Sequence, residues 1–370
     1  MSATPLTPSH PPSASAPAST HPVAWADPAR QALFTAWLAH LQAAQALDLT
    51  TVRLASADAS FRRYLRVDSA HGCRIVMDAP PEKENCQPFV HVAQLMAAAG
   101  LNVPEVLAWD EANGFMLLSD LGNHTMMQVI DPHAPPPLDL YLQAVDVLVQ
   151  WQLASQPTEL PPYDDALLRR ELELFPQWYM GAHRGITIDV AMRKTLDEAF
   201  GHIVQNNLSW PSVYVHRDFM PRNLMVSPLP SSLGVLDFQD AVFGPITYDI
   251  ASLMRDAFLS WDEDFCLDVT IRYWQKARKA GLPVGDDFGE FYRGVEWMGL
   301  QRHLKVAGIF ARLTLRDGKP QYLADTPRFI GYIRTTCARY RELKPLLRLV
   351  ETMEGIASSN ILGFNKNQVK

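Results

Sequence analysis

The chain has 370 residues, of which 48% are hydrophobic, and a formal net charge of −7. This length suits two domains or one bilobal unit, and an acidic balance without a long basic run argues against a nucleic-acid surface. No apolar run approaches the ~20 residues of a membrane span, and the four cysteines form no CxxC pair. We therefore expect a cytoplasmic monomer that acts on a small molecule, with no nucleic-acid or membrane partner.

The N-terminal segment changes character at about residue 25. Residues 1–24 consist almost entirely of Pro, Ser, Ala, Thr and His, a composition too poor in large apolar groups to order itself, so we expect a disordered tail. Asp27 and Pro28 then supply an N-cap and a first helical residue, and apolar residues recur at helical spacing from Leu33 to Leu41.

The next hundred residues carry the pattern of a small sheet. "TVRLASADASFRRYLRV" (51–67) and "GCRIVMDAP" (72–80) alternate apolar and polar residues and predict three consecutive antiparallel strands. "PFVHVAQLMAAAG" (88–100) predicts a helix that ends at a glycine. Two more strands are expected in "VPEVLAWD" (103–110) and "GFMLLSDLG" (114–122).

Helical periodicity dominates the rest of the chain, over 138–155, 188–207 and 286–313, with short apolar strands at "SVYVH" and "LGVLDF". The pattern predicts an α+β protein with a β-rich lobe at 25–119 and a mainly α lobe at 120–370.

The stretch "VYVHRDFMPRNLMV" (213–226) carries the chemistry. His216, Asp218 and Asn223 form H-x-D-x-x-x-x-N, and Asp237 follows Asn223 by fourteen residues in "GVLDFQD". A tight loop after the first strand would present Asp218, and a hairpin between "LMV" and "LGVLDF" would bring Asp237 alongside. Phosphoryl transfer needs one carboxylate beside the acceptor hydroxyl and hard oxygen ligands for Mg²⁺. Asp218 fits the first role, Asn223 and Asp237 fit the second, and His216 fits that of a backbone organiser. The alternative is that all are turn and cap residues.

These motifs resemble the aminoglycoside phosphotransferase and choline kinase-type family, whose fold is like that of protein kinases. "HRDFMPRN" and "LDFQD" match its catalytic loop and metal motif. "ADASFRRYLRV", "MDAPPEKENCQPFV", "FQDAVFGPITYDIASLMRDAF" and "LQRHLKVAGIFARL" look like the bacterial cell-wall-recycling sugar kinases. The resemblance implies a bilobal kinase-like fold, ATP and Mg²⁺ as cofactors, and phosphorylation of the anomeric hydroxyl of N-acetylmuramate or N-acetylglucosamine in peptidoglycan recycling.

The resemblance also implies a nucleotide site. "ADASFRRY" would cover the ATP phosphates and "LLSDLG" would be the hinge beside adenine. The phosphate contacts would be the backbone N–H groups of Asp58, Ala59 and Ser60. The charges of Arg62 and Arg63 would add to them. The nucleotide-binding candidates are Asp58, Ala59, Ser60, Arg62, Arg63, Ser119, Asp120 and Leu121. Because the loop is not glycine-rich, an ordinary β-turn is the alternative for it.

The chain departs from the wider kinase pattern at the third strand. "IVMDAPPEKE" has no lysine where a strand lysine would contact the phosphates, and the following helix has no glutamate to pair with one. Lys83, just past the strand, or one of the arginines 62–63 would make this contact instead. If neither does, the protein would bind ATP more weakly. An exposed loop lysine is the alternative for Lys83.

Candidates for the sugar site are less specific. Trp178, Tyr179 and Trp261 could stack on a sugar face or belong to the core. Asp240 could touch substrate or metal, or satisfy turn amides. Arg302, in a segment with His303 and Lys305, could meet the lactyl carboxylate of N-acetylmuramate or belong to a solvated helix face.

Two rival functions remain open. The same fold could phosphorylate another hydroxyl compound, such as an aminoglycoside or an amino alcohol, because a fold does not fix its acceptor. The missing strand lysine could also mark a nucleotide-binding pseudokinase, although Asp218, Asn223 and Asp237 argue against it.

Overall fold

The computed structural model describes residues 23–57, 61–226 and 233–356. The chain forms two compact units, one of Met1–Gln156 with His216–Val242 and the other of Pro157–Val215 with Phe243–Lys370. All but the last two residues of the expected tail, and the candidates Asp58, Ala59 and Ser60, lie outside the described residues.

The first unit is built on a five-stranded antiparallel sheet of order β1-β2-β3-β5-β4. Its strands are β1 (Leu47–Ala57), β2 (Arg63–Ser69), β3 (Gly72–Asp78), β4 (Val106–Asp110) and β5 (Phe115–Ser119). The strands predicted from alternating polarity are therefore confirmed, as is the helix between the third and fourth strands, α2 (Gln87–Ala98).

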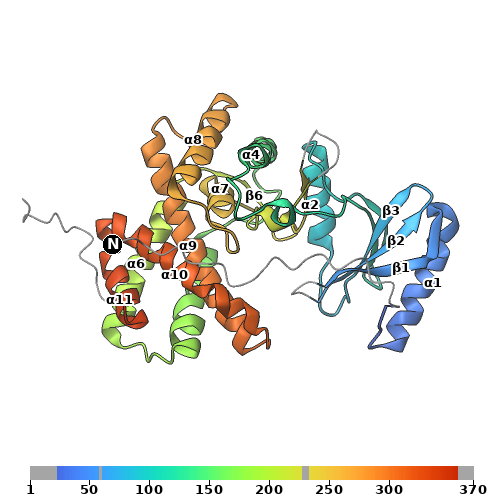
Figure 1. Ribbon diagram of the computed structural model, residues 1–370, viewed down its shortest axis with the longest axis horizontal. Helices are drawn as coiled ribbons and strands as arrows, with labels where there is room; N and C mark the ends of the chain where they lie inside the picture. The colour runs from blue at the N-terminus through green and yellow to red at the C-terminus, as the bar shows by residue number, and fades with distance from the viewer. Residues whose placement is uncertain (1–22, 58–60, 227–232, 357–370) are drawn as a thin grey trace, which may run out of the picture. The chain divides into compact units, whose positions relative to one another are not determined.

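One face of this sheet is covered by α1 (Pro28–Gln45), dark blue in Figure 1. The helix begins as predicted, because the Asp27 carboxylate accepts a hydrogen bond from the Ala29 N–H at 2.9 Å. Its buried residues Phe34 and Leu38 pack with apolar side chains that alternate along the strands. These strand residues are Leu47, Leu65, Val67, Val76, Phe115 and Leu117.

A buried carboxylate joins α1 to the same face. Asp78, at the end of β3, is 4% exposed and forms ion pairs with Arg30 of α1 at 2.6 Å and with Arg63 of β2 at 2.7 Å. The Arg63 guanidinium also lies 3.8 Å from the centre of the Trp25 ring, a cation–π contact. Two cations therefore compensate the buried charge and fix the helix on the sheet.

The remaining elements of the first unit are two α-helices, a 3₁₀ turn and a small hairpin. They are α3 (Met126–Val129), α4 (Leu138–Leu153), the 3₁₀ turn η2 (Pro221–Asn223), and the paired strands β7 (Leu224–Met225) and β8 (Gly234–Val235). The hairpin expected between "LMV" and "LGVLDF" is confirmed.

The second unit is mainly helical, with a two-stranded sheet of β6 (Ser212–Val215) and β9 (Val242–Pro245). Its helices are α5 (Asp165–Leu172), the π-helix η1 (Phe175–His183), α6 (Val190–Leu208), α7 (Thr247–Met254), α8 (Glu263–Lys279), α9 (Phe288–Leu315), η3 (Pro320–Asp325), α10 (Thr326–Arg339), η4 (Arg341–Leu343) and α11 (Lys344–Glu354). The long helix α9, orange in Figure 1, packs against η1, α7 and α10. All four cysteines are free thiols, and no helix in the described residues is long and apolar enough to span a membrane.

Gly308 allows α9 to approach η1 closely. A Cβ atom added there would lie 2.3 Å from the carbonyl oxygen of Leu174. We expect Gly308→Ala to destabilise the protein by ~1–3 kcal/mol, the usual cost of overpacking, as measured by urea denaturation. Gly201 of α6 is the matched control, since a Cβ there would meet nothing within 4 Å and Gly201→Ala should be stabilising by ~0.5–1 kcal/mol. Equal losses would contradict this account.

Candidate active site

The loop that follows β6 holds the predicted catalytic residues in the first unit. His216 is 1% exposed, and its Nδ1 accepts a hydrogen bond from the Asp218 N–H at 3.2 Å. Its Nε2 lies 2.9 Å from the Leu236 carbonyl oxygen. Because Nδ1 is the acceptor, the proton of the neutral ring is on Nε2, which donates to Leu236. His216 therefore joins the loop to the segment that carries Asp237.

Asn223 makes the second connection between these segments. Its side-chain Nδ2 donates to the Asp218 carbonyl oxygen at 2.9 Å and lies 3.4 Å from Asp237 Oδ2. Its backbone carbonyl accepts from the Leu236 N–H at 2.9 Å. Since the nitrogen faces these two acceptors, the carboxamide oxygen is the atom that Asn223 can offer to a cation.

Two loop residues have a left-handed backbone without being glycine. Arg217, next to Asp218, has φ +75°, and Asp237 has φ +61°. Such conformations cost of order 1–3 kcal/mol for non-glycine residues and concentrate at functional sites. The Asp237 carboxylate accepts from Gln239 Nε2 at 2.8 Å through Oδ1, so its orientation is also fixed.

Asn223 and Asp237 together fit a magnesium ion that is shared with a nucleotide. Mg²⁺ in such sites takes one or two protein oxygen ligands and completes its shell with phosphates and water, and these residues bring a carboxamide and a carboxylate oxygen together. No group of three or more His, Cys, Asp and Glu side chains in the described residues could hold a metal. Phosphate and water oxygens would supply the remaining ligands.

The expected hinge residues begin with the last residue of β5 and are braced by an arginine. Asp120 forms an ion pair with Arg66 Nε at 2.9 Å and accepts from the Gly122 N–H at 3.0 Å. Arg66 also donates to the Gly122 carbonyl oxygen. Ser119 exchanges hydrogen bonds with the Glu105 backbone at 3.0 and 2.8 Å. The backbone of Ser119 to Leu121 is thereby held in one path, and its contact with adenine stays a prediction.

The sugar-site candidates have different surroundings. Tyr179 is 2% exposed; its hydroxyl donates to Glu354 at 2.9 Å and its ring stacks on Phe175, which favours the core alternative. Trp178 and Trp261 are half-buried. Asp240 is exposed, and its carbonyl oxygen accepts from Arg217 at 3.3 Å.

The alternative of a solvated face at residues 302–305 is wrong. Arg302, His303 and Lys305 are all buried. The Arg302 guanidinium lies 5.1 Å from the Tyr248 ring centre. Burial lowers the pKa of His303 to about 3, and Lys305 pairs with Glu171 at 3.1 Å. Contact of Arg302 with a substrate remains a prediction.

One buried acid near Arg302 was not predicted from the sequence. Asp256 is 1% exposed, and its Oδ2 has no hydrogen-bond partner among the described residues. Burial raises the pKa of Asp256 to about 6, although the N–H groups of Phe258 and Ala257 and the charges of Arg302 and Arg328 oppose the shift. No sequence signal marks it, because "RDAF" resembles any polar helix end.

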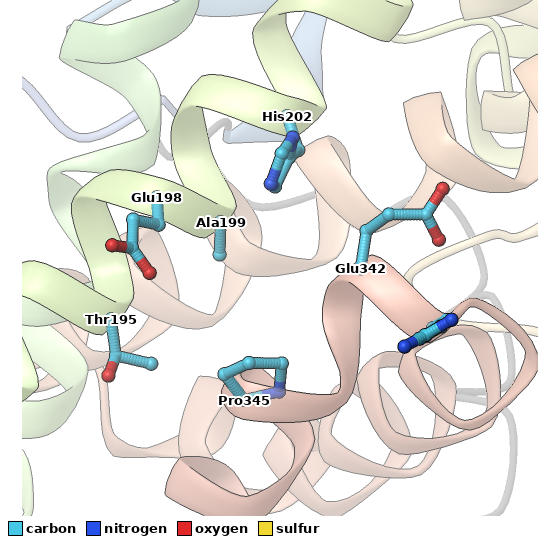
Figure 2. A pocket seen from close by; sticks show the side chains of 7 residues that line it. Thr195, Glu198, Ala199, His202, Glu342 and Pro345 are labelled. Atoms are coloured by element: carbon cyan, nitrogen blue, oxygen red, sulfur yellow. The ribbon is translucent and has the colours of Figure 1, made fainter.

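A pocket of about 270 Å³ lies elsewhere, between α6 and the segment that leads into α11. Figure 2 shows Thr195, Glu198, Ala199 and His202 on one side of it, and Glu342 and Pro345 on the other. None of the predicted site residues lines this pocket, so it is not the candidate site.

Comparisons with known proteins show which proteins this chain resembles. The sequence profile of the phosphotransferase enzyme family matches residues 51–287. The chain is 49% identical over 300 residues to an N-acetylmuramate/N-acetylglucosamine kinase of Pseudomonas aeruginosa, covering 81% of this chain and 87% of that protein. A protein of the same name from Neisseria meningitidis serogroup B is 46% identical over 329 residues, with 88% and 96% covered.

Solved structures with low identity show the same fold. A choline kinase from Streptococcus pneumoniae matches with a TM-score of 0.59 at 11% identity, covering 84% of this chain and 100% of that one. A Plasmodium vivax ethanolamine kinase matches with a TM-score of 0.56 at 10% identity, covering 82% and 84%. The α+β kinase-like fold expected from the sequence is confirmed.

The Asn223 and Asp237 pair generates a prediction about metal dependence. We expect Asn223→Ala and Asp237→Ala each to raise the Mg²⁺ concentration needed for ADP binding by about 10-fold or more, the effect of losing one interaction with a charged group. Calorimetric ADP binding across a Mg²⁺ titration measures this. Asp68→Ala, which removes a carboxylate paired with Arg53 on the sheet, is the control and should leave the titration unchanged. An unchanged titration in both site variants would contradict the assignment.

Proposed function

Because the chain belongs to the phosphotransferase enzyme family, we propose that it transfers the γ-phosphoryl group of ATP to the anomeric hydroxyl of N-acetylmuramate or N-acetylglucosamine. The observation that carries this proposal is the 49% and 46% identity to relatives named N-acetylmuramate/N-acetylglucosamine kinase over more than four fifths of the chain. Family membership implies an enzyme that uses ATP and a divalent metal; Mg²⁺ is our choice because Asn223 and Asp237 offer hard oxygen ligands.

Asp218 is the proposed base. The acceptor oxygen attacks the γ-phosphorus, the bond to the ADP oxygen breaks, and the hydroxyl proton passes to the Asp218 carboxylate. An anomeric hydroxyl is more acidic than an ordinary alcohol, so Asp218 needs only to orient it and accept the proton late. His216 and Asn223 support this role because both hydrogen-bond the Asp218 backbone, at 3.2 and 2.9 Å.

The metal and the nucleotide loop complete the proposal. Bound Mg²⁺ neutralises phosphate charge, and Asn223 and Asp237 would hold it. The backbone of Ser119 to Leu121 would bind adenine. The proposed lobes are 25–119 and 120–370, whereas the compact units group residues 120–156 and 216–242 with the sheet. We further propose that the protein acts as a cytoplasmic monomer in peptidoglycan recycling.

Two other functions have less support. An aminoglycoside or amino-alcohol kinase would share the fold, but the fold alone does not choose the acceptor, and the relatives at 46% and 49% identity carry the amino-sugar name. A pseudokinase would not need Asp218, Asn223 and Asp237 held together by hydrogen bonds. Substrate turnover decides between these possibilities.

The role of Asp218 generates the first prediction. We expect Asp218→Asn to lower kcat by about 10²–10⁴-fold, the usual contribution of a positioned base, while ATP affinity changes by less than a factor of about three because the metal ligands are intact. A coupled ADP-release assay and calorimetry measure the two quantities. Asp264→Asn, on the exposed side of α8, is the control. Residual turnover above roughly a tenth of wild type would rule out this role.

The position to which the phosphoryl group is transferred generates a second prediction of this proposal. If the anomeric hydroxyl is the acceptor, the free sugars N-acetylmuramate and N-acetylglucosamine should react, while their methyl glycosides should be inert because that hydroxyl is blocked. ADP release from the four compounds, with ³¹P NMR of the products, is the measurement. Glucose, choline and kanamycin test the rival acceptors. A product phosphorylated at C6 would overturn the anomeric proposal.

A further inference from the structure

The kinase-like sheet lacks a strand lysine, and Arg62, Arg63 and Lys83 are the candidates to replace its charge. We infer that Arg62, held by Glu84, supplies the positive charge that contacts the nucleotide phosphates in place of that lysine. The inference rests on the proposed function, because it assumes that ATP binds to this unit. The face of the sheet that each cation occupies decides which of them can reach a nucleotide.

The two faces of the sheet have different tasks. Leu65, Val76 and Phe115 face α1, so their neighbours Tyr64, Arg66 and Met77 lie on the opposite face. Arg66 reaches Asp120 in the expected hinge at 2.9 Å. The face opposite α1 is therefore the one that adjoins the hinge and would adjoin a nucleotide. In β3 this face carries the apolar side chains of Ile75 and Met77, which offer no charge to a phosphate.

Arg63 is on the wrong face for this task. It pairs with Asp78 at 2.7 Å and lies 3.8 Å from the centre of the Trp25 ring. Both contacts belong to the α1 side of the sheet. Moving Arg63 to a phosphate would remove one of the two ion pairs that Asp78 forms among the described residues and leave the pair with Arg30. Because the Asp78 carboxylate is 4% exposed, the electrostatic cost would be high.

Lys83 has no fixed anchor for its charge in this structure. Its ammonium group lies 4.9 Å from the centre of the Phe61 ring, and both residues are exposed. An exposed cation–π contact is worth ~0.5–1 kcal/mol, which is too little to hold a flexible side chain in one orientation. Lys83 therefore lacks the preorganisation of a strand lysine that is paired with a carboxylate.

Arg62 has that preorganisation. Its side chain is 9% exposed and pairs with Glu84 Oε2 at 3.2 Å. Burial disfavours its charge, but the neighbouring Tyr64 and Glu84 outweigh this and raise the pKa of Arg62, so it stays cationic. Glu84 Oε1 also accepts from the Phe61 N–H at 3.3 Å. One carboxylate thus fixes both the arginine and the backbone that leads into β2.

The Arg62 and Glu84 pair would play the part of the kinase lysine and glutamate, with both residues coming from other elements. The cation comes from the start of β2 instead of from β3, and the carboxylate comes from the turn before α2 instead of from the helix. A guanidinium has five N–H donors in a planar fork. This number exceeds the hydrogen bonds that a single carboxylate can accept. A guanidinium suits a diphosphate because charge-assisted bonds from a fork are directional.

Binding of ADP and adenosine tests the inference, because adenosine has the base and the ribose but no phosphate. We expect Arg62→Gln to weaken Mg²⁺–ADP binding by about 10- to 100-fold, the range for a lost charge-assisted hydrogen bond, and to leave adenosine binding within a factor of about two. Arg62→Lys should recover part of the loss, and Glu84→Gln should weaken ADP more than adenosine. Arg53→Gln is the matched control, since Arg53 is another sheet arginine paired with a carboxylate, Asp68, at 2.9 Å.

Several outcomes would overturn the inference. Equal ADP affinity of wild type and Arg62→Gln would do so, as would a parallel loss of adenosine binding, which indicates a folding defect instead of a phosphate contact. If Lys83→Ala loses ADP affinity and Arg62→Gln does not differ from wild type, Lys83 is the phosphate cation. Failure of the proposed function looks different: wild type would then release no ADP with any amino sugar, whatever the behaviour of Arg62→Gln.

Discussion

The candidate site depends on one amide nitrogen. Asn223 Nδ2 lies 2.9 Å from the Asp218 carbonyl oxygen and 3.4 Å from Asp237 Oδ2, and thus joins the loop at Asp218 to the segment that carries Asp237. Asp237 is followed by Phe238, whose ring lies 4.8 Å from that of Phe89 in α2. Asp218, Asn223, Asp237 and the helix α2 are therefore positioned by one continuous set of contacts within the first unit.

Much of the fold could be predicted because its signals are local. Alternating side chains in β2 and β3 and the Asp27 cap of α1 each depend on neighbours within a few residues. The spacing of Asp218, Asn223 and Asp237 also predicted that a tight loop and a hairpin would bring them together, and the structure does so. Their chemical roles remain proposals, since spacing fixes proximity and not reactivity.

The missed features depend on contacts between distant segments. Glu84 was not predicted as the partner of a phosphate-binding cation, because the kinase pattern places that glutamate inside the helix. Glu84 precedes the first residue of α2 by three positions. The burial of Lys305 follows from Glu171, more than a hundred residues earlier, and no periodicity in α9 shows this. The packing of α9 against η1 likewise depends on the close approach to Leu174 that Gly308 permits. A local pattern contains none of these partners.

The attachment of α1 also bears on where a minimal folded fragment of this chain must begin. Trp25 lies under the Arg63 guanidinium, Arg30 shares the charge of Asp78, and Phe34 fills the centre of the apolar layer. A fragment that starts at β1 would expose this layer to water and halve the compensation of a buried carboxylate. The helix is thus an integral part of the sheet's structure, and a shortened chain suited to crystallisation should begin upstream of Trp25.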